Sequence, residues 1–383
     1  IKQCKGSVIM NYTVKYMLYL IGCGARGVTP EIPSETLDFE LLFKLSKEHQ
    51  SENLVYVSLE RLGLDVPEDI MRKFRQCTEK AIVREARQEL ELREICGAFA
   101  AEGIRHIPLK GSVMKYMYPS PDLRQNGDMD ILADVRDEDK IKSIMASAGY
   151  ENTSVAEKDL SFYKGKIHIE LHRHLLYPQN PRYEFFERVW DTAKSVNGFT
   201  YEMTAEMMYV FLMTHLASHL AHGGAGIKLI TDFYVFNKPL DSLILNGYLR
   251  ETKLDKLDSI VRRLTDYWFN MRSDADDSVK FLSEYILKNG VYGSSVTSVQ
   301  MEFADKMPPL QKLKHYFKMT FRPYNTMKYL YPVLRKAPVL LPFCYVHRII
   351  KKLTWDIDRT KTIITGSKES ADTDVLREFK KIL

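Results

Sequence analysis

The sequence is poor in the features that mark disulfide-stabilised or membrane-embedded proteins. Its 383 residues include five cysteines, an odd number, which are widely spaced and form no Cys-x-x-C motif. This pattern argues against a disulfide framework and predicts reduced thiols in an intracellular protein. No run reaches the roughly 20 apolar residues that a bilayer-spanning helix needs. The apolar run at residues 16–22 lacks a small-residue cleavage site, so it predicts an amphipathic first helix rather than a secretory signal.

A large excess of charge of one sign is also absent. The chain has 55 Lys and Arg against 50 Asp and Glu, which gives a net charge of +5 and a pI near 8.7. Because the basic residues are dispersed, a nucleic-acid partner is allowed but not required. The sequence contains no internal repeat or low-complexity tract. With 45% hydrophobic and 27% charged residues, the composition is typical of a soluble globular protein.

What the sequence does contain is helical periodicity at both ends. From about residue 35, apolar residues recur at spacings of three and four, as in Leu37, Leu41 and Leu45. The same period returns after about residue 205 and persists to the end. We therefore predict an N-terminal helical region at residues 1–101, with at least three helices before the middle segment, and a C-terminal helical region at residues 201–383.

The middle segment, residues 102–200, has a different pattern of apolar and polar residues. Short alternating apolar runs predict strands, and Lys164-Gly165 between two of them predicts a hairpin turn. The predicted elements are strands at 104–109, 128–133, 160–163 and 166–172, and helices at 112–118 and 137–148. Together these patterns predict an α+β fold, in which a small mixed or antiparallel sheet is flanked by the two helical regions.

Three carboxylates in this segment are candidates for a metal site. Strand side chains alternate between faces, so Asp128 and Asp130 are predicted to share one face while Met129 points into the core. Glu170 lies on a second alternating run. Mg²⁺ is commonly bound by one or two carboxylates together with substrate phosphates, so this set suits a nucleoside triphosphate.

These residues resemble the polymerase-β-like nucleotidyltransferases, and within them a large bacterial family described simply as nucleotidyltransferases. In that superfamily a Gly-Ser opens a helix after the first strand, an Asp-x-Asp follows on the second, and a third carboxylate comes from a later strand. Gly111-Ser112, Asp128, Asp130 and Glu170 match this pattern. With flanking similarities, the resemblance extends over roughly residues 35 to 353.

The resemblance implies a role for each matching residue. Asp128 and Asp130 would hold two Mg²⁺ ions, for which Mn²⁺ could substitute, and Glu170 would complete the site. The amides at Gly111-Ser112 would bind phosphate, although a Gly-Ser at this place can also be a simple helix cap. Lys110 and Arg124 would neutralise phosphate charge, or would be ordinary surface residues.

Two features depart from the family pattern. The spacing from Gly111-Ser112 to Asp128 is longer than in the smallest members of the superfamily, which implies a longer connection. Relatives often carry an aromatic residue after the Glu-Leu-His triplet, where this chain has Arg173.

The histidines offer alternatives. His168, Glu170 and His172 alternate along one strand, so a Zn²⁺-type triad is a rival to the Mg²⁺ site; in the preferred interpretation His172 orients Glu170 or a phosphate. Further along the chain, His215, His219 and His222 share one helical face.

The family similarity suggests that His219 or His222, together with Asp232, faces the catalytic cleft. The structural alternative is an interior, hydrogen-bonded histidine with an aspartate that caps a helix.

The distal stretches at 312–318 and 347–352 are basic with interleaved aromatic and aliphatic residues. They are interpreted as solvated helix faces packed on the core, so contact with a membrane surface or RNA is not expected. The last segment, 370–383, predicts a solvent-facing amphipathic helix.

These observations predict a cytoplasmic, Mg²⁺-dependent nucleotidyltransferase that moves a nucleoside monophosphate, AMP from ATP, onto a hydroxyl or amine acceptor with release of pyrophosphate. The acceptor is open: a small molecule, a peptide, a protein side chain and RNA all fit. Two alternatives remain, a phosphotransferase that uses the same metal site and a non-catalytic nucleotide-binding regulator or antitoxin-like partner protein.

Overall fold

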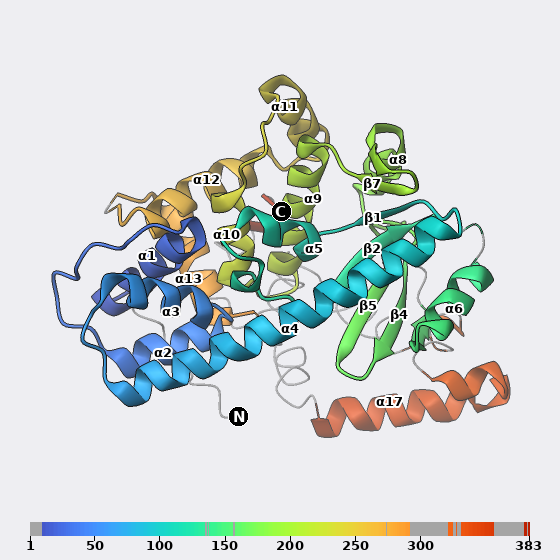
Figure 1. Cartoon of the computed structure of the whole chain (residues 1–383). Coiled ribbons are helices and arrows are strands. Elements are labelled where there is room, and N and C mark those ends of the chain that lie inside the picture. Colours follow the sequence, from blue (N-terminus) through green and yellow to red (C-terminus); the bar gives the residue numbers. More distant parts are fainter. Residues whose placement is uncertain are drawn as a thin grey trace.

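A computed structural model of the protein describes residues 10–134, 136, 138–155, 158–272, 274–291, 321–324, 327, 331–355, 379–380 and 382–383. A helical part and a sheet part lie side by side, and one long helix runs across both (Figure 1). The helices of the first part of the chain are α1 (Tyr12–Arg26), α2 (Phe39–Glu48), α3 (Glu52–Leu62) and the long helix α4 (Glu68–Ala101). Short helices follow around the sheet: α5 (Gly111–Met114), η1 (Lys115–Met117), η2 (Pro121–Leu123), α6 (Glu138–Ser147), α7 (Tyr183–Glu187) and α8 (Val189–Thr192). The later helices are α9 (Ala205–Ala221), α10 (Ile227–Val235), α11 (Ser242–Glu251), α12 (Asp255–Phe269), α13 (Asp277–Asn289), η4 (Pro332–Arg335), η5 (Pro338–Leu340) and α17 (Leu341–Trp355).

In the described residues, seven strands form one mixed sheet in the order β3-β4-β5-β2-β1-β7-β6. The pairs β2–β5 and β1–β7 are parallel, and the other neighbours are antiparallel. The strands are β1 (His106–Pro108), β2 (Met129–Ala133), β3 (Glu151–Val155), β4 (Asp159–Lys164), β5 (Ile167–His172), β6 (Lys194–Asn197) and β7 (Thr200–Glu202). The α+β class and the mixed sheet are therefore confirmed.

The two faces of the sheet have different neighbours because its side chains alternate. Met129 and Ile131 of β2, with Ile169 of β5, belong to a core cluster that includes residues of α4 and α6, among them Phe99 and Met145. The residues between them point to the opposite face. That face is the one that turns toward the helical part of the molecule, so polar residues at the intervening positions are brought to the junction of the two parts.

The helices before residue 102 and those after residue 205 share a second core cluster. Its centre is α1, which contacts α3, α12 and α10. Tyr16, Met17 and Leu20 are almost fully buried, as are most residues of this helix. The first helix predicted at this apolar run is therefore present, and it lies at the centre of the cluster; Asn11 caps it by accepting a hydrogen bond from the amide of Val14.

Most predicted elements of the middle segment appear, with shifted ends. The predicted helix at 112–118 is split into α5 and the 3-10 turn η1, and residue 137, the predicted start of α6, lies outside the described residues. Three strands were not predicted: β3, β6 and β7. The side chains that β3 and β6 present are exposed and polar for most of their length, because both strands form the edges of the sheet and bury no continuous face. Gly165, at φ 58°, turns the β4–β5 hairpin as expected.

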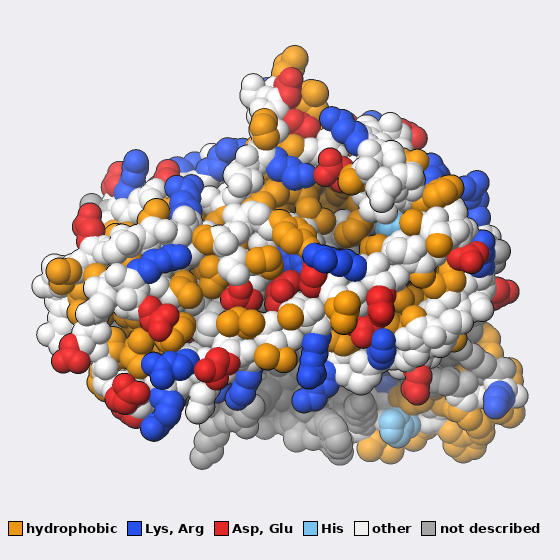
Figure 2. All heavy atoms as spheres, in the orientation of Figure 1, with side chains coloured by type: hydrophobic (Ala, Val, Ile, Leu, Met, Phe, Trp, Pro, Cys, Tyr) orange, Lys and Arg blue, Asp and Glu red, His pale blue; other side chains and the backbone are white. Residues whose placement is uncertain are grey.

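The distal region is described only in part. Residues 312–318 and most of 370–383 lie outside the described residues, so what the sequence indicates for them stays a prediction. Helix α17 exposes Phe343, Val346 and Ile350, at 70%, 54% and 54% of their surface, and Figure 2 shows hydrophobic side chains gathered along it. Of these three residues only Ile350 belongs to the stretch 347–352, which is helical; the packing predicted for that stretch stays a prediction.

Over the face shown in Figure 2, Lys and Arg side chains alternate with Asp and Glu. The four cysteines in the described residues are free thiols. Among the residues that the structure describes, none of the helices combines the length and the apolar character that a membrane crossing needs.

Candidate active site

The three predicted carboxylates converge at the junction of β2 and β5. The parallel register pairs Asp130 with Glu170, so that neighbouring strands present both side chains on the face opposite to the α4 and α6 core. Ligand atoms of Asp128, His168 and Glu170 lie within 4.8 Å of one another, and so do those of Asp130, Glu170 and His172. Glu170 belongs to both groups, which makes it the link between the two aspartates.

Asp130 is held by two side chains on the same oxygen. Lys110 Nζ lies 2.7 Å and His172 Nε2 lies 2.6 Å from its Oδ1. Burial acts to raise the pKa of Asp130, but Lys110 and His172 outweigh burial and hold the pKa well below its usual value. Burial lowers the pKa of His172, so a neutral imidazole with its proton on Nε2 fits this contact. His172 was predicted to orient Glu170 or a phosphate; its short contact is instead to Asp130, with Glu170 Oε2 3.8 Å away, and contact with a phosphate stays a prediction.

The pKa of Glu170 shifts in the opposite direction to that of Asp130. Burial, together with the charges of Asp130 and Asp128, raises its pKa from 4.5 to about 7. Lys110 opposes this shift but does not cancel it. The cluster thus contains more negative charge than its neighbours compensate, which is the condition that a bound cation relieves.

The donor set of this cluster fits a hard divalent cation. Asp128, Asp130 and Glu170 offer carboxylate oxygens, which Mg²⁺ and Mn²⁺ prefer. The contacts of Lys110 and His172 both fall on Oδ1 of Asp130 and do not involve Oδ2. Asp128, Asp130 and Glu170 are therefore the residues that would hold such an ion.

The rival triad of His168, Glu170 and His172 does not assemble as one site. In the described residues, His168 and His172 fall into different groups, each with its own aspartate. The reason is geometric, because residues four apart on a strand are separated by about 13 Å. His168 instead stacks on Tyr163, with ring centroids 4.2 Å apart.

The Gly111-Ser112 turn carries strain. Lys110, just before α5, has a φ of 46°, which non-glycine residues rarely adopt. A Cβ at Gly111 would overlap the side chains of Asn126 and Arg124, so the glycine is needed for packing against these two residues. Ser112 Oγ is buried and has no hydrogen-bond partner in the described residues. The helix that begins here is only four residues long, shorter than predicted.

Arg124 has a structural partner across the fold. Its Nε and Nη2 donate to the two carboxylate oxygens of Asp232 at 2.9 and 2.7 Å, and Tyr118 donates to the same carboxylate at 2.9 Å. Arg124 and Asp232 are 5% and 1% exposed. Burial acts to lower the pKa of Arg124, but Asp232 outweighs it and raises the pKa. Asp232 was expected to face the cleft; the structure has it behind Arg124, to which it binds.

A pocket of about 280 Å³ lies between the carboxylates and the helices α9 and α10. It includes Asp128 and Asp130, whereas Glu170 adjoins them without lining the pocket. The pocket is lined by Gln50, Lys110, Gly111, Arg124, Asn126, Gly127, Asp128, Asp130, Leu212, His215, His219, Gly226, Lys228, Leu229 and Val291.

Of the three histidines on α9 and its end, two reach this pocket. His215 and His219 line it, with ring centroids 4.5 Å apart. Burial and the nearby Lys110 lower the pKa of both, so they are neutral at pH 7. His222 is exposed and bonds the carbonyl of Ser218, so it is not among the lining residues. For His215 the sequence predicted only that it shares a helical face with His219 and His222.

Lys228 is a cationic residue of the pocket that was not predicted from the sequence. It is the second residue of α10, and Nζ donates to the carbonyl of Gln125 at 3.0 Å. Burial, and then Arg124, lower its pKa to about 8. The available signal was a lysine two residues after Gly226, where the glycine-rich turn ends, and four residues before Asp232.

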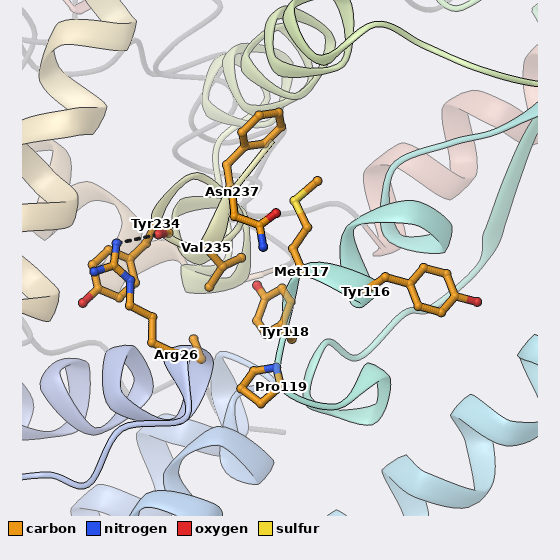
Figure 3. Close-up of a pocket in the computed structure, with 10 residues that line it drawn as sticks. Arg26, Tyr116, Met117, Tyr118, Pro119, Tyr234, Val235 and Asn237 are labelled. Carbon is orange, nitrogen blue, oxygen red and sulfur yellow. Dashed lines mark hydrogen bonds between the residues drawn. The ribbon is translucent and has the colours of Figure 1, made fainter. Parts of the chain in front are cut away.

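A second pocket, of about 520 Å³, lies between the end of α1, η1 and the end of α10 (Figure 3). Arg26 lies on the ring of Tyr234 and donates to its carbonyl at 2.9 Å, while Tyr118 and Pro119 form the facing wall. Because Tyr118 also binds Asp232, the Tyr118–Asp232–Arg124 network separates this pocket from the one that contains the carboxylates.

Replacing Glu170 by Gln is expected to stabilise the metal-free protein. A carboxyl whose pKa is raised on folding binds more protons in the folded state, so stability falls as pH rises from 4.5 to about 7. At pH 8 the full cost is present; the shift sets an upper limit of about 3 kcal/mol. The side chain is 27% exposed, so we expect Glu170→Gln to gain about 1 to 2 kcal/mol at pH 8 and nothing at pH 4.

Urea unfolding at the two pH values measures this difference. Glu170→Asp, which keeps the charge, serves as the control and should show no such gain. A Glu170→Gln protein that is less stable than the parent at pH 8 would contradict the electrostatic picture of the cluster.

Comparison with known proteins adds one finding. A family model described as "Uncharacterised nucleotidyltransferase" matches residues 35–270, well over half of the chain. The matched region begins where the predicted resemblance begins and includes every residue of the carboxylate cluster and its pocket except Val291. No curated protein and no solved structure matches.

Proposed function

We propose, from the premise that the chain belongs to the family of uncharacterised nucleotidyltransferases, that it transfers a nucleoside monophosphate from ATP to a hydroxyl or amine acceptor. The observation that supports this proposal is the convergence of Asp128, Asp130 and Glu170 from β2 and β5 beside a pocket. Three carboxylates in one cluster would repel a phosphate chain unless a cation lay between them. A metal–triphosphate complex satisfies both the charge and the donor types.

The bond changes of the proposed reaction are those of nucleotidyl transfer. The acceptor oxygen or nitrogen forms a bond to the α-phosphorus, the bond from that phosphorus to the bridging oxygen of the β-phosphate breaks, and pyrophosphate leaves. The acceptor loses its proton to solvent. When bound, Mg²⁺ supplies charge neutralisation and lowers the pKa of the acceptor group.

The residues of this chain position the reactants. Asp130 is fixed by Lys110 and His172, so its carboxylate cannot rotate freely. Arg124 presents its charge at the pocket wall while Asp232 holds the guanidinium in place. Leu212 and Leu229 supply apolar surface beside these groups, which suits a nucleobase or sugar.

Position-specific labelling tests the proposal. The protein is incubated with Mg²⁺ and ATP labelled at the α-phosphate, in the presence of a lysate separated into protein, RNA and metabolite pools. We expect one pool to gain label, with release of pyrophosphate. ATP labelled at the γ-phosphate should leave the pools unlabelled.

Each other outcome selects an alternative. Transfer of γ-label with release of ADP would identify a phosphotransferase at the same site. Binding of ATP without transfer to any pool would favour a non-catalytic regulator or a partner protein of the antitoxin type. Absence of nucleotide binding would contradict the proposal as a whole.

A further inference from the structure

We propose that Lys228 binds the phosphate chain of the nucleotide substrate and thereby sets the affinity for triphosphate; this inference rests on the proposed function. From the sequence, only Lys110 and Arg124 were predicted as cations that bind phosphate. The structure adds a third cation, which comes from α10 and lines the same pocket as Asp128.

The position of Lys228 fits this role. Its Nζ donates to the carbonyl of Gln125 at 3.0 Å, in the loop that leads through Asn126 and Gly127 to Asp128. Lysine has three donors on Nζ, so this one contact leaves donors for a ligand. A phosphate chain that begins at the carboxylate cluster therefore meets Lys228 along the wall formed by this loop.

The charges around Lys228 also support a role for this residue in phosphate binding. In the described part of the chain no carboxylate forms an ion pair with it, and its contact with Gln125 supplies no counter-charge. Asp232, one helical turn further along α10, is already bound by Arg124 and Tyr118. Even a partly buried ammonium without a counter-ion is costly, and an anion in the pocket would supply that counter-ion.

The other two cations of the pocket are already paired. Lys110 contacts Asp130, and Arg124 contacts both oxygens of Asp232. Each would have to give up or share a short contact to bind phosphate. Lys228 would not, so it is the cation that an incoming anion can engage without breaking an ion pair.

Binding of inorganic tripolyphosphate tests the inference without an acceptor. Lys228→Met should weaken binding of tripolyphosphate and of MgATP by about tenfold to a hundredfold, as expected for loss of one charged hydrogen bond. Lys228→Arg should retain most of the affinity. Lys238→Met serves as the matched control, because Lys238 forms a partly exposed pair with Glu202 outside the pocket.

The pH dependence separates ligand binding from a structural role. The charged groups that act on Lys228 are Arg124 and Asp128 on the loop, Asp232 on α10 and Arg84 on α4, with His219 on α9 also nearby. Lys228 is protonated at pH 7 and loses its charge as pH rises through about 8. Affinity should therefore fall up to tenfold per pH unit above pH 8. Comparison with Lys228→Met at each pH removes the titration of the ligand itself.

The outcomes are distinguishable. If Lys228→Met binds tripolyphosphate as tightly as the parent, or if the alkaline fall persists unchanged in it, the inference is wrong and the proposed function stands. If the parent binds neither tripolyphosphate nor MgATP, both fall. Should Lys228→Met fail to fold, the pH profile of the parent and the affinity of Lys228→Arg still decide the matter.

Discussion

Asp128→Asn is expected to reduce nucleotidyl transfer on the order of a thousandfold while leaving the fold intact. A metal ion contributes several kcal/mol to transition-state stabilisation, and each 1.36 kcal/mol corresponds to a factor of ten. Asp128 is partly exposed and takes no part in the contacts of Lys110 and His172 with Asp130. Its replacement therefore removes a proposed metal ligand without leaving a buried partner unpaired.

Two measurements check this expectation. One is the rate of pyrophosphate release from ATP with the labelled acceptor pool. The other is binding of Mn²⁺ followed by electron paramagnetic resonance, which needs no acceptor. Asp139→Asn, at an exposed carboxylate on α6 in the same α/β segment, should match the parent in both. An Asp128→Asn protein with a tenth or more of the parent rate would contradict the metal assignment.

Asp130→Asn should lose activity to a similar degree but should also lose stability. Its carboxylate neutralises Lys110, whose side chain is 16% exposed, and accepts from His172, which is buried. Losing it leaves the Lys110 ammonium without a counter-charge. The contrast between the two aspartates separates a proposed metal ligand that Lys110 and His172 hold in place from one that makes neither contact.

The carboxylates could be predicted from the local sequence because the directions of their side chains depend mainly on neighbouring residues in the same strand. Alternation along a strand fixes the relation of Asp128 to Asp130, and adjacent parallel strands then bring Glu170 alongside. The family resemblance supplied the third carboxylate on a later strand, whereas the parallel pairing of that strand with β2 was not predicted and is seen only in the structure. The roles proposed for these residues remain to be tested by experiment.

The partners of these residues could not be predicted in the same way. Arg124 and Asp232 are separated by 108 positions, and nothing in the local sequence of either one indicates the other. Lys228 was overlooked for the same reason, because its burial depends on how α10 lies against the loop before β2. Edge strands β3 and β6 were missed since exposed polar strands carry no hydrophobic alternation.

Asp232→Asn is expected to destabilise the protein by about 3 to 5 kcal/mol, the usual cost of breaking a buried ion pair by removing one partner. Asn can accept only part of the hydrogen bonding that the carboxylate provides to Arg124 and Tyr118, and it supplies no counter-charge to the guanidinium. Total stabilities are about 5 to 15 kcal/mol, so the loss should be evident as a large fall in the urea midpoint.

Two matched variants show whether burial of charge is the cause. Tyr118→Phe removes one hydrogen bond to the same carboxylate and should cost only about 1 to 2 kcal/mol. Glu251→Gln breaks the Arg188–Glu251 pair, whose side chains are 49% and 52% exposed, and should cost less than about 1 kcal/mol. If Asp232→Asn costs no more than Glu251→Gln, the Arg124–Asp232 pair does not carry the buried charge that the structure indicates, and Arg124 must instead be stabilised by water. In that case Arg124 would be free to bind a phosphate. Arg124, and not Lys228 alone, would then be a cation that an incoming anion can engage without breaking an ion pair.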